Sequence, residues 1–462
     1  MAANGRHAIQ TRLCGHSRSF CIAMVTAFVA ASAAAQAAQA QGRPELSLAG
    51  ALREIAARST AAVTANLDLD TAREGTRRAQ GSYYPSVSLS AGYVLRDHEV
   101  IAKFGAFQAP TTERNFPVAE IDATQLLWDG GRRSSAMRNS RSAEDATAMQ
   151  GQADVRTAQL EGMGTYLGIL VVKAERRVLA QRETSLKDHL REVTDLFEHG
   201  VVARNDLLAT EVRLRSVQDQ GGRVDNDESV AVQALNRLMG RSPGEPLELP
   251  GELPSPPPLP ASLEELTKRA AEGNRQILAL RARLKAEQDA VAMRKADSFP
   301  TLIVQASHSY QQNQYLLYPN ANVLFLGVNW QAYDGGIRQA NVREAEIAVA
   351  KTQQEIADLH RQFETRVDQA YRDYLQALRE AVTAETNVKA SEENLRIVED
   401  QYKAGLARST DVLDAESTLA ESRFSLVNQH YSAYFKQGAL LTVADEDLAT
   451  FYANLAPRRQ EQ

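Results

Sequence analysis

Two stretches of 68 residues, 131–198 and 336–403, contain no proline, and they limit most strongly what this chain can fold into. Ala, Leu, Arg, Glu and Gln are abundant in the chain, which favours helices. In the first stretch apolar residues recur at seven-residue steps, as at Leu179, Leu186 and Val193. A helix of this length would extend for about 100 Å. Its heptad spacing predicts packing along neighbouring helices rather than around a globular core.

The two stretches belong to two copies of an internal repeat, which is the first pattern to seek in a long chain. Four landmarks recur in the same order: Ser47-Leu48 as Ser262-Leu263, Tyr84-Pro85 as Phe299-Pro300, Trp128-Asp129-Gly130-Gly131 as Tyr333-Asp334-Gly335-Gly336, and 200–208 as 405–413. Each copy is predicted to begin with one helical stretch of about 37 residues, 48–84 and 263–299, that ends at a proline. Two strands around a loop, a turn, the long helix, a glycine turn and a returning helix follow.

The repeat sets the expected domain boundaries. The first copy covers residues 41–242 and the second covers residues 263–455. A proline-rich linker, 243–262, lies between them, and its composition fits both a disordered spacer and an ordered strap. Residues 456–462 are expected to form a C-terminal tail.

Residues 1–40 have the pattern of a secretory signal peptide, with three arginines before an apolar, Ala-rich segment. Both cysteines, Cys14 and Cys21, lie inside it, and neither follows the pattern of a lipoprotein signal. The mature chain would therefore have no thiol for a disulfide, a metal or a nucleophile. Cleavage removes three arginines and no acid, so the formal charge would move from −6 to −9. This balance argues against a nucleic acid partner.

Four short strands are expected, at about 86–96, 117–128, 301–310 and 322–332. In the first one apolar residues alternate with small or polar ones, which gives one apolar face. The lengths match the 9–11 residues of a tilted membrane-crossing strand, although the hairpin tip of a soluble protein would look similar. Three large aromatic residues lie at the ends of these strands, as in a membrane-interface belt: Trp128, Trp330 and Tyr333.

Four strands cannot close a barrel, and open strand edges in lipid would leave backbone groups unsatisfied. If the strands lie in a membrane, several copies must therefore share one barrel. Three copies would provide about twelve strands, an even number within the known range of such barrels.

The order of these features resembles the TolC family of outer-membrane efflux proteins over about residues 45–455. The motifs that carry the resemblance are Trp128-Asp129-Gly130-Gly131, and Tyr402-x-x-Gly405 followed by Asp411-Val412-Leu413-Asp414-Ala415. The resemblance implies a homotrimer in which a twelve-stranded outer-membrane β-barrel stands on a long periplasmic α-helical barrel. It also implies a passive exit duct in a tripartite efflux or type I secretion system. Such a duct meets outer-membrane lipid, a periplasmic adaptor (membrane fusion) protein and an inner-membrane pump of the ABC or RND type.

The resemblance further implies a gate at the periplasmic end. The family's gate aspartates correspond to Asp411 and Asp414, with Asp206 as the first-copy equivalent of Asp411, and Tyr402 matches its gate tyrosine. The gate arginine is replaced by alanine, but Arg408 follows one residue later and is expected to substitute in part. Six carboxylates around one opening would attract cations. Capping of a helix start is an alternative explanation for Asp206 and Asp411, and a weaker one for Asp414.

The turns at Gly200-Val201 and Gly405-Leu406 match the places where the family contacts its adaptor. A glycine C-cap that ends a helix is a compatible explanation.

The sequence shows no signature of an enzyme. The histidines are scattered, and no phosphate-binding loop, dinucleotide fingerprint or nucleophile elbow is present. We therefore expect no catalytic activity, cofactor or metal. A periplasmic coiled-coil adaptor or scaffold without a membrane barrel is the alternative function, and the two matched strand pairs with terminal aromatic residues argue against it.

Overall fold

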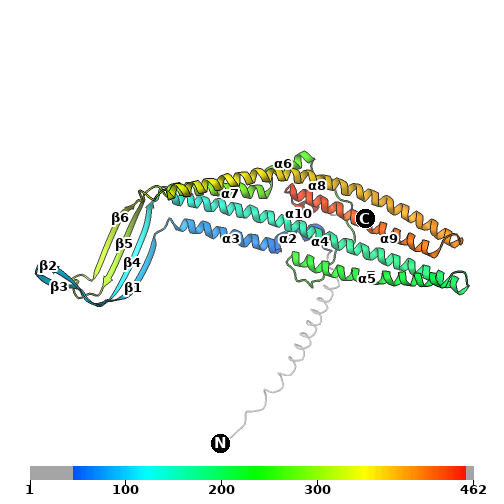
Figure 1. The fold of residues 1–462 in the computed structure, drawn as a ribbon, viewed down its shortest axis with the longest axis horizontal. Helices are drawn as coiled ribbons and strands as arrows, with labels where there is room; N and C mark the ends of the chain where they lie inside the picture. The colour runs from blue at the N-terminus through cyan, green and yellow to red at the C-terminus, as the bar shows by residue number, and fades with distance from the viewer. Residues whose placement is uncertain (1–44, 454–462) are drawn as a thin grey trace, which may run out of the picture.

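The computed structural model describes residues 45–453 and shows an elongated chain with a β-sheet at one end and long helices at the other (Figure 1). The predicted signal peptide at 1–40 and the predicted tail at 456–462 lie outside the described residues. The elements in chain order are α2 (Leu48–Arg58), α3 (Thr60–Gly81), β1 (Ser86–Leu95), β2 (Val100–Phe104), β3 (Phe107–Thr112), β4 (Asn115–Trp128), α4 (Arg132–Glu198), α5 (Arg204–Leu238), α6 (Leu263–Gly273), α7 (Arg275–Ala296), β5 (Thr301–Gln311), β6 (Asn320–Asn329), α8 (Ile337–Lys403), α9 (Ser409–Val443) and α10 (Leu448–Ala453).

The long helices pack along their lengths, as the heptad pattern predicts. Helices α4 and α8 have 67 residues each, and the returning helices α5 and α9 have 35 each. Helix α4 packs against α5 and also against α9 of the second copy. Leu179 and Leu186 of α4 are buried in one cluster with Val217 and Val224 of α5 and Leu413 of α9. The two helical hairpins, α4–α5 and α8–α9, therefore share a continuous apolar seam.

No helix within residues 45–453 is both long enough and apolar enough to cross a membrane.

Each copy begins with two helices, so the prediction of one helix of about 37 residues was wrong. The first copy breaks at Ser59, whose ψ of 155° is extended and whose side chain accepts a hydrogen bond from the Ala62 N–H. The second copy breaks at Asn274, whose side chain accepts a hydrogen bond from the Gln276 N–H. Ser and Asn cap helix starts because their oxygens replace a missing backbone acceptor. Both breaks are therefore new helix starts, placed at equivalent points of the repeat.

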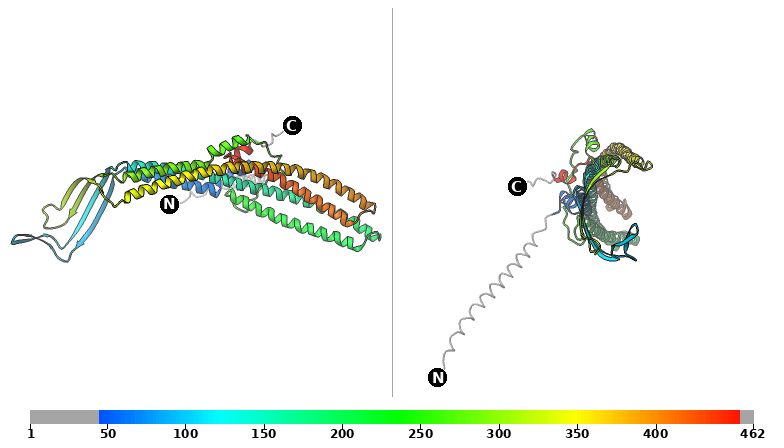
Figure 2. Two further views of the ribbon diagram at one scale, coloured as in Figure 1. Left: turned by 45° about the horizontal axis from the view of Figure 1, so that its top comes forward. Right: turned by 90° about the vertical axis from the view of Figure 1, so that its left-hand side faces the viewer.

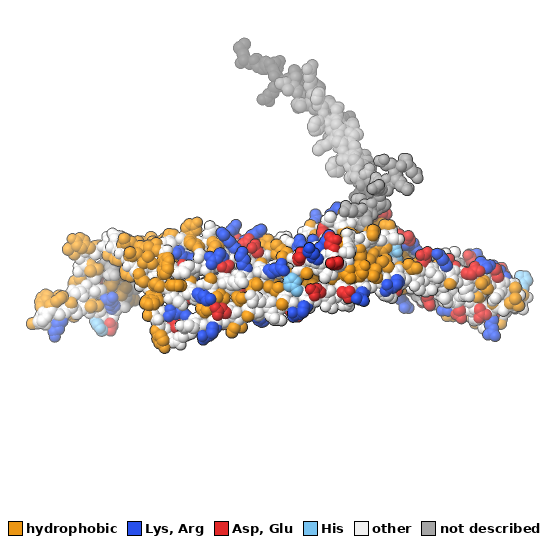
Figure 3. All heavy atoms as spheres, turned by 90° about the horizontal axis from the view of Figure 1, so that it is seen from above, with side chains coloured by type: hydrophobic (Ala, Val, Ile, Leu, Met, Phe, Trp, Pro, Cys, Tyr) orange, Lys and Arg blue, Asp and Glu red, His pale blue; other side chains and the backbone are white. Residues whose placement is uncertain are grey.

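The four long strands form one antiparallel sheet in the order β1-β4-β5-β6, so pairing of β4 with β5 joins the two copies. Leu89 of β1 lies opposite Ile121 of β4, on the face where β6 places its exposed leucines. The other face is mostly polar, and there the Gln305 side chain donates to Asp122. In Figure 3 apolar side chains accordingly gather over this end of the molecule. Exposed apolar residues of the first face include Val87, Leu89, Tyr93, Leu95, Ile121, Leu324, Leu326 and Val328.

The structure differs from the predicted strands at two places. The segment expected to be a loop after β1 contains a second hairpin, β2–β3, which turns at Gly105 with a φ of 63°. Strand β6 ends at Asn329, before the predicted end near residue 332, because the chain leaves the sheet there to enter the Asp334 turn. Trp330 and Tyr333 therefore follow the strand instead of ending it.

The proline-rich linker is an ordered strap. Its Leu249 side chain is buried, and the Glu248 carbonyl accepts a hydrogen bond from the Leu46 N–H at 2.8 Å. The Pro257 carbonyl accepts from the side chain of Gln437 in α9. Fixed φ angles and missing N–H groups keep such a segment extended while its carbonyls remain available as acceptors. The strap thus connects the two copies through contacts along its length.

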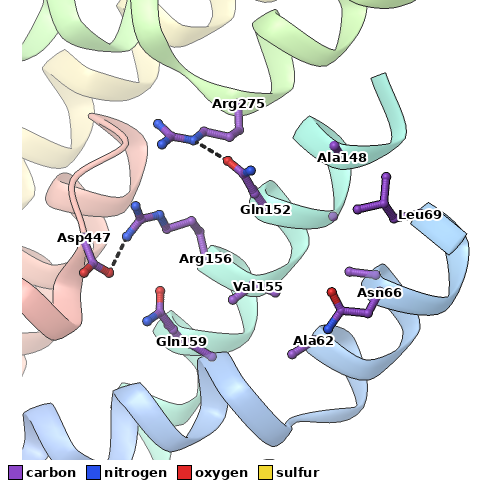
Figure 4. Close-up of a pocket in the computed structure, with 13 residues that line it drawn as sticks. Ala62, Asn66, Leu69, Ala148, Gln152, Val155, Arg156, Gln159, Arg275 and Asp447 are labelled. Atoms are coloured by element: carbon purple, nitrogen blue, oxygen red, sulfur yellow. Dashed lines mark hydrogen bonds and ion pairs between the residues drawn. The ribbon is translucent and has the colours of Figure 1, made fainter. Parts of the chain in front are cut away.

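An ion pair attaches the segment before the last helix to α4 (Figure 4). Arg156 of α4 pairs with Asp447 at 2.6 Å, and Arg275 of α7 donates to Gln152 at 3.1 Å. These side chains line a pocket of about 430 Å³ between α3, α4 and α7. Because its charged groups are already paired, the pocket is best explained as part of this attachment.

Replacing Gln437 with leucine is expected to lower the apparent Tm of the protein. Gln437 is fully buried, donates to the Pro257 carbonyl and accepts from the Tyr452 hydroxyl. Leucine leaves the Pro257 carbonyl and the Tyr452 hydroxyl without these hydrogen-bond partners, and each loss lowers the stability by about 1–3 kcal/mol. Thermal unfolding measures the effect, with the exposed Gln376→Leu of α8 as a control that should change stability by less than about 0.5 kcal/mol. An unchanged Tm for Q437L would contradict the role of this hydrogen-bond network.

Candidate functional site

Two equivalent turns connect the sheet to the long helices. The Asp129 carboxylate accepts from the Gly131 N–H at 3.2 Å and from the Arg133 N–H at 2.9 Å. Asp334 makes the same two bonds to Gly336 and Arg338, both at 3.0 Å. Both glycines of each turn have positive φ, a conformation that side-chain-bearing residues rarely adopt. The repeated Asp-Gly-Gly motif thus aims each long helix at a fixed angle from the sheet.

The predicted interface aromatics lie together at this junction. Trp128 ends β4, and its ring packs edge-on against Phe299 with 6.2 Å between the ring centroids. The Trp330 ring N–H donates to the Ser298 carbonyl at 3.2 Å. Tyr333 precedes the second turn and is exposed. All three aromatic side chains are exposed, and each combines an apolar ring with one polar group.

The two helix turns at the opposite end have the same backbone geometry. Gly200 and Gly405 both have a φ of 71°. The Val201 N–H donates to a carbonyl five residues back at 2.8 Å, and the Leu406 N–H does the same at 2.8 Å, which closes both helices. The Val201 and Leu406 side chains are 67% and 82% exposed. The turns therefore place an apolar residue at each outermost point of the helical hairpins.

The predicted gate aspartates lie just inside these turns. Asp411 caps α9, because its carboxylate accepts from the Arg408 N–H at 2.8 Å. Asp206 has the same position in α5, but within residues 45–453 its carboxylate accepts no hydrogen bond from a backbone N–H. Asp414, three residues after Asp411, is largely exposed and lies 3.7 Å from the Arg213 guanidinium of α5. A charge pair at that exposure contributes little stability, so the Asp414 carboxylate is available to solvent and ions.

Tyr402 faces inward beside the acids, whereas Arg408 does not contact it. The pKa of Tyr402 is raised, mainly by burial and further by the nearby carboxylates of Glu192 and Asp206. The tyrosine is therefore neutral at physiological pH. The Arg408 side chain is exposed and makes no hydrogen bond or ion pair within residues 45–453.

His189 of α4 also belongs to this cluster, and sequence reasoning missed it. Its Nε2 lies 3.0 Å from the Ser409 hydroxyl of α9, and its ring packs edge-on against Tyr402 at 5.4 Å. Burial lowers the pKa of His189, so the imidazole is neutral at physiological pH. A signal was present, since His189 follows Leu186 by three residues and thus continues the buried heptad stripe.

The polar and aromatic contacts of this cluster lie between helices of the two hairpins, α4–α5 and α8–α9. Within the part of the chain that the structure describes, no three His, Cys, Asp or Glu side chains are grouped to hold a metal. The contacts near the turns join α4, α8 and α9. Movement of one hairpin relative to the other would have to break them.

A sheet with one apolar face, joined by rigid turns to two long helical hairpins, defines the subunit of an outer-membrane channel. The chain belongs to the outer membrane efflux protein family, whose model matches residues 51–241 and 266–444. This is a family of channel proteins rather than enzymes. The protein is therefore an efflux channel subunit that is located in the outer membrane and extends into the periplasm. This assignment decides against the alternative of a scaffold without a membrane part.

Similarity to characterised proteins extends over most of the chain. The outer membrane protein TolC of Salmonella enteritidis is 24% identical over 409 residues, which are 84% of this chain and 80% of that protein. The alkaline protease secretion protein AprF of Pseudomonas aeruginosa is 23% identical over 276 residues, 58% of this chain and 56% of that protein. The structure of VceC from Vibrio cholerae matches with a TM-score of 0.71 at 18% identity and covers 86% of this chain and 96% of that one.

Replacing Gly405 with alanine is expected to destabilise the protein by about 1–2 kcal/mol, the cost of a left-handed backbone for a side-chain-bearing residue. A Cβ would meet no atom within 4 Å, so only the backbone conformation is changed. Gly221→Ala is the control, because Gly221 lies inside α5 with equally open surroundings. It should raise stability by up to about 1 kcal/mol. Thermal unfolding measures the Tm of both variants. Tm shifts of the same sign in G405A and G221A would contradict the left-handed turn at Gly405.

Proposed function

We propose that three copies of this chain assemble into a passive duct across the outer membrane and periplasm, gated at its periplasmic end. The observation that carries the proposal is the four-stranded sheet, which has one apolar face and two unpaired edges. Strand β1 is paired only with β4, and strand β6 only with β5, within residues 45–453. Unpaired backbone groups in lipid cost several kcal/mol each. Pairing β1 of one copy with β6 of the next removes both edges.

The curvature of the chain supports closure by three copies. Viewed end-on, the strands and helices follow one shallow arc (Figure 2). Three such arcs would give a ring of twelve strands with the apolar face toward lipid and the polar face, with Asp122 and Gln305, toward the lumen. Trp128, Trp330 and Tyr333 would then lie at the membrane–water boundary, which favours aromatic rings with one polar group.

We further propose that the turns contact a periplasmic adaptor (membrane fusion) protein that connects the duct to an inner-membrane pump of the ABC or RND type. Val201 and Leu406 support this assignment, because they expose apolar side chains at the outermost points of the helices. Docking would bury these side chains, a gain of about 25 cal/mol per Å² of apolar surface. AprF, a relative named for protease secretion, supports a role in type I secretion beside efflux.

Asp411 and Asp414, with Asp206 nearby, are proposed as the acidic ring of the gate. Both residues of α9 are exposed in the single chain and lie one helical turn apart. Three copies would bring six carboxylates of these two residues to one opening, where they would concentrate cations. Tyr402 would support the acidic ring from its half-buried position. The Arg408 side chain, which is exposed, would be available to a neighbouring copy.

Reconstitution in planar bilayers tests the duct itself. A trimer in detergent that gives steady, cation-preferring conductance steps is the expected result. A monomeric protein that stays soluble without detergent and gives no steps would overturn the proposal.

The double variant D411N/D414N should weaken cation selectivity and block by divalent cations. Asparagine is chosen because it still caps a helix start but carries no charge. The reversal potential in a KCl gradient and the Mg²⁺ concentration for half block are the measurements. D219N/D227N makes the same charge change on exposed positions of α5 and should behave like the wild type. Unchanged selectivity and block in D411N/D414N would refute the acidic ring.

A further inference from the structure

Helices α4 and α9, which belong to different copies of the repeat, meet along two polar contacts one heptad apart. Near the turns, His189 of α4 contacts Ser409 of α9. Seven residues back along α4, the Arg182 guanidinium donates to the Ser417 hydroxyl of α9 at 2.6 Å. Polar residues in the apolar seam of a coiled coil fix the register of the two helices and reduce the stability of their packing. The polar contacts therefore set the register of α4 against α9 and make this packing less stable than a fully apolar seam would be.

Glu416, adjacent to Ser417, is the least expected residue in the seam. Its side chain is buried, with 6% exposure, in a segment otherwise packed by Leu413 and Leu419. One carboxylate oxygen, Oε2, is buried without a hydrogen-bond partner in residues 45–453, and so is the Nε of Arg182. Both residues line a cavity of about 30 Å³ between α4, α8 and α9. A cavity of this size holds about one water molecule, which would satisfy only part of a charged carboxylate.

The charges that face Glu416 come from all four long helices. Arg182 of α4 and Arg213 of α5 favour its ionised form, whereas Glu399 of α8 opposes it. Glu421 and Arg423 lie on α9 itself, and Arg423 lines the same cavity. Burial outweighs the arginines, and it raises the pKa of Glu416 from 4.5 to about 7. Burial and the neighbouring Arg213 likewise lower the pKa of Arg182.

We propose that Glu416 is a proton-binding site that controls the separation of the two helical hairpins, so that deprotonation favours the open duct. The neutral acid fits the packed seam, whereas the carboxylate must gain water by moving α9 away from α4. This inference rests on the proposed gated duct. It adds a control element inside the wall, separate from the exposed aspartates of the opening.

The direction of the pH effect follows from linkage. In the packed seam the pKa is about 7, and exposure to water would return it toward the ordinary value of a glutamate, so opening releases a proton. For one such group the ratio of open to closed channels should rise about tenfold between pH 6 and pH 8. His189 acts in the opposite direction, because exposure would raise its lowered pKa and bind a proton. A comparison that cancels the contribution of His189 is therefore required.

Glu416→Gln provides that comparison, since it mimics the protonated acid and leaves His189 in place. We would record open probability in planar bilayers at pH 6 and pH 8 for the wild type, E416Q and the control E421Q. Glu421 is exposed on the same helix, five residues away. The ratio of open to closed channels, divided by its value in E416Q, should rise in the wild type and in E421Q by about tenfold for each copy whose hairpins separate on opening, and thus by up to about a thousandfold if all three separate together. Stepwise conductance with the same pH profile in E416Q and wild type would refute the proton site.

The two proposals fail in different ways. Absence of conductance steps at both pH values, from a verified trimer, would refute the duct and with it the gating role of Glu416. A second measurement is independent of gating: the Tm difference between E416Q and wild type should grow as the pH rises from 5 to 8, because only the wild type must bury an ionising group. A constant difference would also refute the site. Glu416→Met, neutral and apolar, supports the same comparison if E416Q does not assemble.

Discussion

The buried apolar stripe of α4 is the contact on which the rest of the structure depends. Leu179 and Leu186 pack against α5 of their own copy and against α9 of the other copy at the same time. Nearer the sheet, the same helix contacts α2, α3 and α7. A helix in a protein gains most of its stability by packing its apolar stripe, and α4 does so along 67 residues. The length of α4 therefore sets the elongated shape. Its simultaneous packing against α5 and α9 keeps the two copies in register.

Much of the fold could be predicted, because its signals are local or periodic. Missing prolines, heptads and the repeated Asp-Gly-Gly turns each report on backbone geometry within a few residues. The helix breaks at Ser59 and Asn274 could not be predicted, because a cap and a continuous helix differ by only about 1 kcal/mol. Hairpin β2–β3 was missed for a related reason, since short strands give weak alternation. At the site, the heptad spacing indicates that His189 is buried, but it does not show which helix lies opposite. The contacts of His189 with Ser409 and Tyr402 therefore could not be predicted, and neither could the burial of Glu416.

The two copies have kept their backbone geometry and diverged in side chains. Their turns agree in φ to within a few degrees, and their paired helices agree in length. Polar side chains near the turns lack such symmetry, since the Asp411 carboxylate accepts from the start of its helix and no matching bond to Asp206 is found within residues 45–453. Backbone constraints act on both copies alike, whereas each side chain meets a different neighbour.

The strap and the ends of the described chain have a consequence for biogenesis. The largest core cluster combines Leu52 near the start, Met163 of α4, Leu249 of the strap, and Tyr434 and Tyr452 near the end. No part of the chain short of its final helix contains all the residues of this core. The first copy therefore cannot complete its folding while the second is still being exported. Until residue 452 emerges, apolar residues of this core therefore stay without part of their packing partners, and such exposed surface makes an incomplete chain prone to aggregation.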